Sequence, residues 1–419
     1  MPEDKEKQGA SSPEKIVEAT TIADVYRAAK QLEGITVKTG LIHSDFFSET
    51  CGNDVYIKPE NLQHTGAFKL RGAYNRISQL SEEEKVKGVI TASAGNHAQG
   101  VAFAAQKLGV KAVICMPATT PILKVEATRA YGAEVVLHGD SFDDAYAHSL
   151  ALQKQRGYVY IHPFNDREVL LGQGTTALEI IDALKDVDAI LVPIGGGGFA
   201  SGVALATKLV NPGVKVIGVE PENAACMKAA LDKGKIVTLK SSDTVADGCA
   251  VKTAGDLTFA FCRKYLDEIL TVSEMEIMSA LLSLIEKHKL IAEGAGVLSL
   301  AGLLKLPFRG KKVVAIVSGG NIDISTISAL IDKALIARGR VFCFSVQLPD
   351  KPGQLLKVSQ ILAEENANVI KLDHNQAKVT DSFKKVILEV TVETHNQAHI
   401  DRILKAMEKN GFHDIEQIY

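Results

Sequence analysis

The sequence contains no Cys-x-x-Cys pair, although it has six cysteines in 419 residues. Zinc sites and redox motifs use closely spaced cysteines, whereas disulfide frameworks are typical of short secreted chains. The scattered thiols therefore argue against a metal site or a disulfide framework, and they favour reduced cysteines in a cytoplasmic protein. The six residues are Cys51, Cys115, Cys226, Cys249, Cys262 and Cys343.

Long apolar runs and an excess of positive charge are also missing. No stretch approaches the roughly 20 apolar residues that span a bilayer. Residues 1–15 are polar, unlike the apolar centre of a signal peptide, and we expect residues 1–17 to form a disordered tail. The formal net charge is −3, so the composition indicates neither nucleic acid nor a membrane as a partner.

Short apolar runs alternate with helical patterns over most of the chain, and we expect residues 18–338 to form one α/β domain. Strands that are apolar on both faces and alternate with helices make open parallel sheets. In such sheets, ligands bind beyond the carboxyl ends of the strands. The strand-like runs are VYIK, VITAS, KAVICM, AEVVLH, AILVPIGG, VKVIGVE, EILTV and KVVAIVSGG.

The pattern changes after residue 338. Residues 341–419 are predicted to form a strand, a helix, two strands, a helix and a short last strand. The strands alternate apolar and polar residues, as antiparallel strands with one buried face do. We therefore predict a separate α+β domain with the order βαββαβ.

Three loops of small or polar residues follow predicted strands, and a lysine lies upstream of them. The loop SAGNHAQG (93–100) suits a carboxylate, and GGGGFASG (195–202) suits a phosphate, because both expose backbone N–H groups. Ser318 in SGGN ends a third strand. Lys69, in ENLQHTGAFKLRGA, is either a solvated helix residue or an amine nucleophile. An amine beside a phosphate cradle indicates covalently bound pyridoxal 5′-phosphate (PLP).

Two other functions stay open on these residues. Gly195, Gly197 and Ala200 fit the pattern G-x-G-x-x-A, and Glu220 ends the following strand, as in dinucleotide-dependent oxidoreductases. That function would leave Lys69 unexplained. The third possibility is an amino-acid sensor whose α/β portion has lost activity, which the intact lysine and polar loops argue against.

Four motifs in this order resemble the threonine dehydratase and serine racemase branch of the fold-type II PLP enzymes. They are ENLQHTGAFKLRGA, SAGNHAQGVA, GGGGFASG and SGGNID. The resemblance covers about residues 20–335 and implies a tryptophan synthase β-like fold with open parallel sheets in two subdomains, the smaller at about residues 88–165. Residues 341–419 are similar to an ACT domain, a small-molecule regulatory module.

The resemblance also implies roles for individual residues. Lys69 would hold the cofactor and act as the catalytic base on the substrate Cα proton. Phe68 would pack against the cofactor, Asn96 would bond its 3′-oxygen, and Ser318 would meet its pyridine nitrogen. The phosphate would lie on the backbone amides of Gly195, Gly196, Gly197 and Gly198. The substrate carboxylate would lie on the loop made by Ser93, Ala94, Gly95, Asn96 and His97.

The implied reaction is β-elimination from an amino acid. L-Threonine would give 2-oxobutanoate and ammonia, and L-serine would give pyruvate, in a homodimer or homotetramer. An amino-acid effector would bind the loop PDKPGQL (349–355) of the ACT-like domain, with Asn368 across a domain interface. Isoleucine or valine is the natural candidate, since 2-oxobutanoate leads to isoleucine. The preferred substrate and the choice between a biosynthetic and a catabolic role stay open.

Two positions depart from the racemase pattern. Ala94 stands where racemases have a second serine that reprotonates Cα, so elimination should dominate over racemisation. Cys226 stands where the divalent-cation pattern Glu-Pro-x-Asn-Ala-x-Asp has its aspartate, so we predict no such metal site, although a monovalent ion near Glu220 stays open.

Other candidates have plainer explanations. Arg71 is expected to hold its helix by salt bridges, and Cys249 to be a buried thiol. Glu293 is a candidate for a place near the cofactor ring or the substrate. His395 and His399 have the spacing of helical metal ligands but no third partner, and we expect a solvated helix face.

Overall fold

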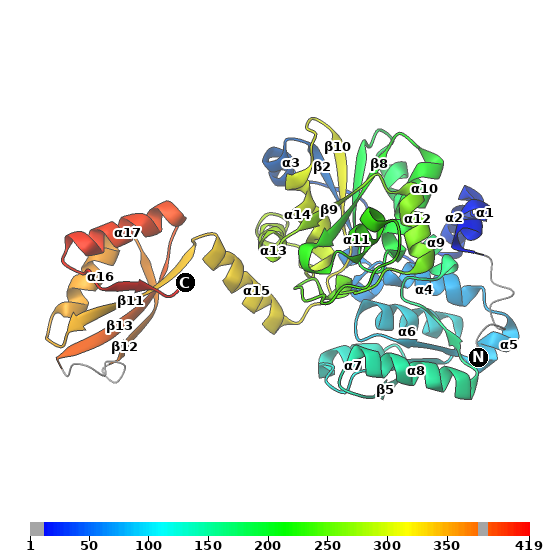
Figure 1. Cartoon of the computed structure of the whole chain (residues 1–419), viewed down its shortest axis with the longest axis horizontal. Coiled ribbons are helices and arrows are strands. Elements are labelled where there is room, and N and C mark those ends of the chain that lie inside the picture. The colour runs from blue at the N-terminus through cyan, green and yellow to red at the C-terminus, as the bar shows by residue number, and fades with distance from the viewer. Residues whose placement is uncertain (1–11, 376–383) are drawn as a thin grey trace. The chain divides into compact units, whose positions relative to one another are not determined.

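The computed structural model of the protein describes residues 12–375 and 384–419. The chain divides into two compact units, Met1–Ile322 and Asp323–Tyr419, and Figure 1 labels many of their elements. Within the described residues, no helix combines the length and the apolar character needed to cross a membrane.

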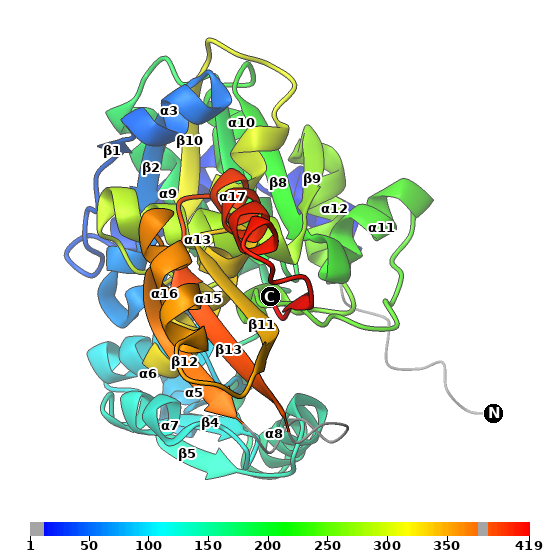
Figure 2. The same cartoon turned by 90° about the vertical axis from the view of Figure 1, so that its left-hand side faces the viewer.

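The first unit is built on two separate sheets, as both views show (Figures 1 and 2). The larger sheet has the order β1-β2-β10-β7-β8-β9, in which only the pairing of β1 with β2 is antiparallel. Its strands are β1 (Ile42–His43), β2 (Asp54–Pro59), β7 (Ala189–Pro193), β8 (Lys215–Pro221), β9 (Glu268–Val272) and β10 (Lys312–Val317).

The smaller sheet is entirely parallel and has the order β5-β4-β3-β6. Its strands are β3 (Val89–Ala92), β4 (Ala112–Met116), β5 (Glu134–Leu137) and β6 (Val159–Tyr160). The helices that accompany it are α5 (Glu82–Lys87), α6 (Asn96–Leu108), α7 (Ile122–Arg129) and α8 (Phe142–Arg156). Buried apolar residues of β3, β4 and α6 form its core, as β-branched runs facing a helix would.

The remaining helices of the first unit surround the larger sheet. The α-helices are α1 (Pro13–Ala19), α2 (Ile22–Gln31), α3 (Asp45–Cys51), α4 (Lys69–Ser78), α9 (Arg167–Ala183), α10 (Gly198–Val210), α11 (Cys226–Lys233), α12 (Asp256–Tyr265), α13 (Glu274–His288) and α14 (Leu298–Gly302). The short 3₁₀ turns are η1 (Glu60–Leu62), η2 (His64–Gly66), η3 (Glu222–Ala224), η4 (Asp247–Cys249), η5 (Ala295–Val297) and η6 (Leu303–Lys305).

Glycines let α9 pack closely against both α4 and α10. A Cβ atom at Gly172 would lie 2.5 Å from the Arg71 carbonyl oxygen, and one at Gly202 would lie 2.1 Å from the Leu170 carbonyl oxygen. Neither position can hold a side chain, so the backbones approach as only glycine allows. This packing brings the start of α4, with Lys69, and the start of α10, with the four-glycine loop, to the same helix.

The described residues of the second unit form an antiparallel sheet with the order β12-β13-β11-β14 and three helices. Its strands are β11 (Val341–Pro349), β12 (Asn368–Asn375), β13 (Lys385–Glu393) and β14 (Ile415–Gln417), and its helices are α15 (Ile324–Ala337), α16 (Gln354–Glu364) and α17 (Gln397–Lys409). Alternate residues of β11 and β13 are buried against α16 and α17, which confirms the predicted βαββαβ order.

Three details differ from the sequence predictions. The disordered tail was predicted to reach residue 17, but α1 begins at Pro13, because Ser12 caps it at Lys15 N and Val17 is buried in the core. Residues 1–11 lie outside the described part of the chain. Strands β1 and β6 were not predicted, since two residues carry no periodicity. The unit boundary also precedes α15, whereas the prediction ended the first domain at residue 338.

Candidate active site

Lys69 opens α4 and lies at the centre of the predicted site. Its Nζ donates a hydrogen bond to the Pro163 carbonyl oxygen at 2.8 Å, and no carboxylate of the described residues forms an ion pair with it. Burial lowers the pKa of Lys69 to about 8, because the loss of hydration of the ammonium group outweighs the opposing effects of Cys249 and Glu293. A sizeable fraction of this amine is therefore neutral, and nucleophilic, near neutral pH.

The loop before Lys69 is bonded to the loop that follows β10. Phe68 N donates to the Ser318 carbonyl oxygen at 3.1 Å, and Gly320 N donates to the Gly66 carbonyl oxygen at 2.9 Å. The Ser318 side chain is buried, and its hydroxyl donates to the Ala295 carbonyl oxygen at 3.4 Å. The structure thus brings Lys69 and Ser318 together from positions about 250 residues apart in the chain.

Asn96, the first residue of α6, faces the same loops. Its Nδ2 donates to Glu293 Oε1 at 2.5 Å, and its Oδ1 accepts from Asn321 Nδ2 at 2.7 Å. Burial raises the pKa of Glu293 to about 7. The candidate Glu293 is therefore a neighbour of Asn96, and its carboxyl group changes charge in the neutral pH range.

The loop from Ser93 to His97 divides into an open part and a buried part. Ser93, Ala94 and Gly95 are half-buried, and a Cβ atom at Gly95 would meet no atom within 4 Å. The His97 imidazole is buried, with Nε2 2.9 Å from the Ile161 carbonyl oxygen. Burial lowers the pKa of His97 to about 3, so its ring is neutral and offers a carboxylate no positive charge.

The four-glycine loop joins β7 to α10. Gly197 has a φ of 94°, in the left-handed region. A Cβ atom at Gly196 would lie 2.5 Å from the Phe164 ring, and one at Gly198 would lie 2.8 Å from the Phe164 backbone. The loop therefore needs glycine on steric grounds, and its amides lie at a helix N-terminus, where an anion is favoured.

These residues fit PLP. The neutral amine of Lys69 can bind an aldehyde, the start of α10 can bind a phosphate, and Phe68, stacked on Phe199 at 3.8 Å between ring centroids, supplies an aromatic wall. The dinucleotide alternative fits less well, because Glu220 is fully buried. It accepts bonds from the backbone N–H groups of Met227 and Lys228, at 2.9 Å and 2.8 Å, and is not available to a ribose.

Several neighbours of the site were not predicted. Pro163 contributes a backbone carbonyl, and His162 accepts bonds from Phe164 N and Asn165 N through Nδ1. Burial lowers the pKa of His162 to about 4. Their segment, YIHPFN, carries no glycine-rich motif and begins at the end of the two-residue strand β6, so no pattern in the sequence marked it.

The other candidates lie as follows. Arg71 forms the predicted salt bridges, with Glu60 and Glu179. Cys249 is buried, as predicted, and burial raises the pKa of its thiol. His399 is buried and lies 2.7 Å from the Glu365 carbonyl oxygen, so the predicted solvated face is wrong for it. Within the described residues, no group of three or more side chains has a metal-binding arrangement.

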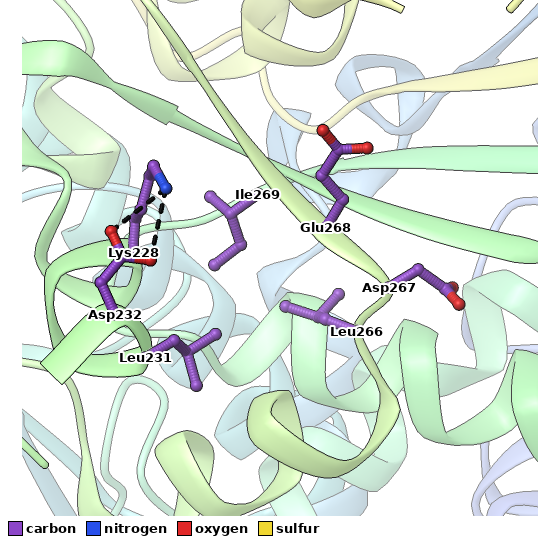
Figure 3. Close-up of a pocket in the computed structure, with 7 residues that line it drawn as sticks. All are labelled: Lys228, Leu231, Asp232, Leu266, Asp267, Glu268 and Ile269. Carbon is purple, nitrogen blue, oxygen red and sulfur yellow. Dashed lines mark hydrogen bonds and ion pairs between the residues drawn. The ribbon is translucent and has the colours of Figure 1, made fainter. Parts of the chain in front are cut away.

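A surface pocket lies apart from these residues (Figure 3). It has a volume of about 100 Å³ and is lined by residues of α11 and by the segment that enters β9. Lys228 and Asp232 are paired within it at 3.2 Å. None of the predicted site residues lines it, so it takes no part in the arrangement around Lys69.

Comparisons with known proteins show what this chain is similar to. Residues 344–412 match the ACT domain family. The L-threonine ammonia-lyase of Thermotoga maritima is 46% identical over 395 residues, which cover 94% of this chain and 98% of that protein. The catabolic L-threonine dehydratase of Escherichia coli K12 is 46% identical over 313 residues, covering 74% of this chain and 95% of that protein.

Solved structures and the family match confirm the predicted fold class and cofactor. Threonine deaminase isoform 2 of Solanum lycopersicum has a TM-score of 0.71 and 41% identity, covering 74% of this chain and 94% of that chain. Maize serine racemase has a TM-score of 0.71 and 35% identity, covering 77% of this chain and 99% of that chain. Residues 32–319 match the family described as pyridoxal-phosphate dependent enzyme, and the chain belongs to that family.

Proposed function

We propose that the protein is a threonine ammonia-lyase. It converts L-threonine to 2-oxobutanoate and ammonia, and it also converts L-serine to pyruvate. The observation that carries the proposal is the buried amine of Lys69, which has a carbonyl oxygen as its partner and a pKa of about 8. Relatives that share 46% of their residues and most of their length with this chain are named L-threonine ammonia-lyase, which supports the substrate.

PLP, when bound, supplies an electron sink for negative charge at the substrate Cα atom. The protein then has to move protons and exclude competing reactions. Lys69 is the residue that can accept the Cα proton, because its amine is neutral in part of the population at neutral pH. Ser318 offers a neutral hydroxyl, so it does not impose a positive charge on the pyridine nitrogen.

Each step of the elimination can be written with its bonds and protons balanced. The Cα–H bond breaks and its proton goes to Lys69 Nζ. The bond from Cβ to the hydroxyl oxygen also breaks, and the hydroxyl leaves as water by taking up one proton, which balances the proton lost from Cα. The released enamine becomes an imine, and one water hydrolyses it to the 2-oxo acid and ammonia. Water is thus lost and regained, and the net change is loss of ammonia.

The substrate carboxylate is assigned to the loop from Ser93 to His97. Its open part, at Gly95, has space for a ligand, and it leads into the N-terminus of α6. His97 would contribute its backbone N–H, since its imidazole is neutral and bonded elsewhere. Ala94 supplies no hydroxyl, which supports elimination over racemisation.

The test is the product spectrum of the purified holoenzyme. L-Threonine should yield 2-oxobutanoate, and L-serine should yield pyruvate, each with one equivalent of ammonia, while D-serine formation from L-serine should be minor. Ala94→Ser should raise the fraction of L-serine that is converted to D-serine. A holoenzyme that racemises serine faster than it releases pyruvate would contradict the assignment.

We also propose that the second unit regulates the enzyme. The predicted effector loop joins β11 to α16, where Gly353 has a φ of 89° at the helix N-terminus. Asn368 begins β12 and donates to Glu393 at 2.8 Å. An amino acid such as isoleucine or valine would bind there between paired units of a homodimer or homotetramer. Titration of initial rates with each amino acid, alongside mass measurement in solution, tests both parts.

A cytoplasmic location completes the proposal. All six cysteines are free and buried in the structure, which suits a reducing compartment. Both biosynthetic and catabolic relatives are similar to this chain, at 42% and 46% identity, and a role in isoleucine biosynthesis is favoured by the presence of the ACT-like unit. Inhibition by isoleucine would support that role, and indifference to isoleucine would favour a catabolic one.

A further inference from the structure

Asn96 is held by a chain of side-chain hydrogen bonds that the sequence motifs do not reveal. Asn321 Nδ2 donates both to the Thr65 carbonyl oxygen, at 2.6 Å, and to Asn96 Oδ1, at 2.7 Å. Asn96 Nδ2 in turn donates to Glu293 Oε1 at 2.5 Å. We call these three side chains, Asn321, Asn96 and Glu293, the amide clamp.

The orientation of each amide in the clamp follows from its partners. A backbone carbonyl only accepts hydrogen bonds, so the atom of Asn321 that faces Thr65 must be the nitrogen. The second N–H of that nitrogen then requires the oxygen of Asn96. The nitrogen of Asn96 therefore faces Glu293, and one of its two hydrogens is left for a ligand.

The backbone around the clamp is shaped to leave it room. A Cβ atom at Gly66 would lie 2.7 Å from Asn321 Oδ1, and one at Gly319 would lie 2.5 Å from Glu293 Oε1. Thr65, a β-branched residue, has a φ of 61°, which directs its carbonyl at Asn321 at a cost in backbone strain. Both the strain and the two glycines are explained if the clamp has a use.

Glu293 lies among charged and titratable groups of several loops. Lys69 and Lys124 act on it as positive neighbours and Asp247 as a negative one, and Cys249 also interacts with it. Burial outweighs these effects and raises its pKa to about 7. The charge of Glu293 therefore changes in the neutral pH range, and the change acts directly on Asn96, which is hydrogen-bonded to it.

We propose that Glu293 and Asn321 are positioning residues that aim the free N–H of Asn96 at the 3′-oxygen of bound PLP. A change in the protonation state of Glu293 then changes the hydrogen bond that Asn96 donates to the cofactor. The inference rests on the proposed role of Asn96 in holding PLP. An ionised Glu293 accepts the hydrogen bond from Asn96 Nδ2 and polarises the Asn96 amide group. A protonated Glu293 is itself a hydrogen-bond donor and competes with that amide. The absorption of the bound cofactor reports this difference because the 3′-oxygen is part of the chromophore.

The test is a pH titration of the absorption spectrum of the holoenzyme, without substrate, between about pH 5.5 and 8.5. The wild-type band should shift with a midpoint near 7. Glu293→Gln should bind PLP and lose this shift, because glutamine keeps the acceptor and cannot titrate. Glu220→Gln is the matched control: Glu220 is a buried carboxyl whose pKa burial also raises to about 7, but it bonds the start of α11. This variant should keep the shift.

A binding measurement tests the second half of the clamp. Asn321→Ala should weaken PLP binding by about tenfold, and Asn321→Asp by more, because its carboxylate would face two oxygens. The inference is contradicted if Glu293→Gln holds PLP and titrates as the wild type does, or if Glu220→Gln loses the shift equally. A wild-type protein that binds no PLP would overturn the cofactor assignment along with this inference.

Discussion

Lys69 and Arg71 are two basic residues on the same turn of α4, but their hydrogen-bond partners differ and their pKa values shift in opposite directions. The Arg71 guanidinium has no solvent exposure and donates to Glu60, through Nε at 2.8 Å, and to Glu179, through Nη1 at 2.7 Å. These carboxylates raise its pKa. Lys69 has the Pro163 carbonyl oxygen at 2.8 Å, and burial lowers its pKa to about 8.

The difference separates a structural cation from a reactive amine. A guanidinium stays charged in any protein environment, so burying it requires carboxylates in a well-matched geometry. A lysine can instead give up its proton when its charge is not compensated. The motif KLRGA thus places the permanent charge of Arg71 two residues from the removable charge of Lys69. Carboxylates compensate the first charge, and no carboxylate of the described residues forms an ion pair with the second.

The largest effect is expected from removing the reactive amine. Lys69→Ala should lower the turnover of L-threonine by about 10³-fold or more, since both cofactor attachment and the general base are lost. The 2-oxobutanoate released by PLP-saturated protein measures this. Folding should be intact by circular dichroism. Retention of even a tenth of the wild-type turnover would mean that another group performs the chemistry.

The structural cation should give the opposite result, a loss of stability. Arg71→Gln leaves the buried Glu60 and the half-buried Glu179 with Lys58 as the basic residue paired with them, and it should cost about 3–5 kcal/mol in the free energy of unfolding. Urea denaturation of the holoenzyme measures this.

Arg76→Gln, on the same helix, is the matched control for Arg71→Gln. Arg76 is partly exposed, and among the described residues its one ion-pair partner is Asp166, at 3.1 Å, so its loss should cost about 1 kcal/mol or less. If the two variants were equally stable, the buried network around Arg71 would not have the structural role given to it here.

The pH dependence of cofactor uptake sharpens the contrast. With a pKa of about 8, about 10% of Lys69 is neutral at pH 7, against about 0.03% for an ordinary lysine. The rate at which apoprotein takes up PLP should therefore rise about tenfold per pH unit and level off above about pH 8. Stopped-flow absorbance measures this rate. A rate that continues to rise beyond pH 9.5 would indicate an unperturbed amine.

A smaller effect than that of Arg71→Gln is a gain in stability on losing Lys69. Its folded pKa lies below the unfolded value of 10.5, so the folded state carries a penalty that is complete below about pH 8 and fades as the pH rises to 10.5. Lys69→Met should stabilise the apoprotein by about 1–2 kcal/mol at pH 7. The gain should disappear near pH 10.5. Urea midpoints at the two pH values test this, and an equal gain at both would assign it to packing.

Much of this contrast could be predicted from sequence. The apolar runs predicted every longer strand of the two parallel sheets, because buried parallel strands leave a continuous signal. Lys69 and the four-glycine loop stood out because a lysine among apolar residues and four successive glycines both need a reason. The salt bridges of Arg71 were predicted, but their partners were not. An arginine at the start of an apolar helix seldom remains buried without a partner.

The partners could not be predicted, for physical reasons. Glu293 and Asn96 are 197 positions apart, and their contact depends on how two loops pack. Pro163 acts through its backbone carbonyl, which no side-chain pattern marks. His399 was predicted to lie on a solvated face because its metal-ligand spacing lacks a third partner, yet it is buried and bonded to the backbone of Glu365. Strands β1 and β6, with two residues each, have no periodicity to detect.

The most direct test of the account is to locate the cofactor on the chain. Holoenzyme is reduced with borohydride, which fixes PLP to the amine that carries it, and the digested protein is examined by mass spectrometry. We expect the added mass on the peptide containing Lys69 and its loss in Lys69→Ala, with Arg71→Gln still labelled at Lys69. Label on a different lysine, or an unlabelled protein after exposure to PLP, would contradict the assignment of Lys69 as the reactive amine.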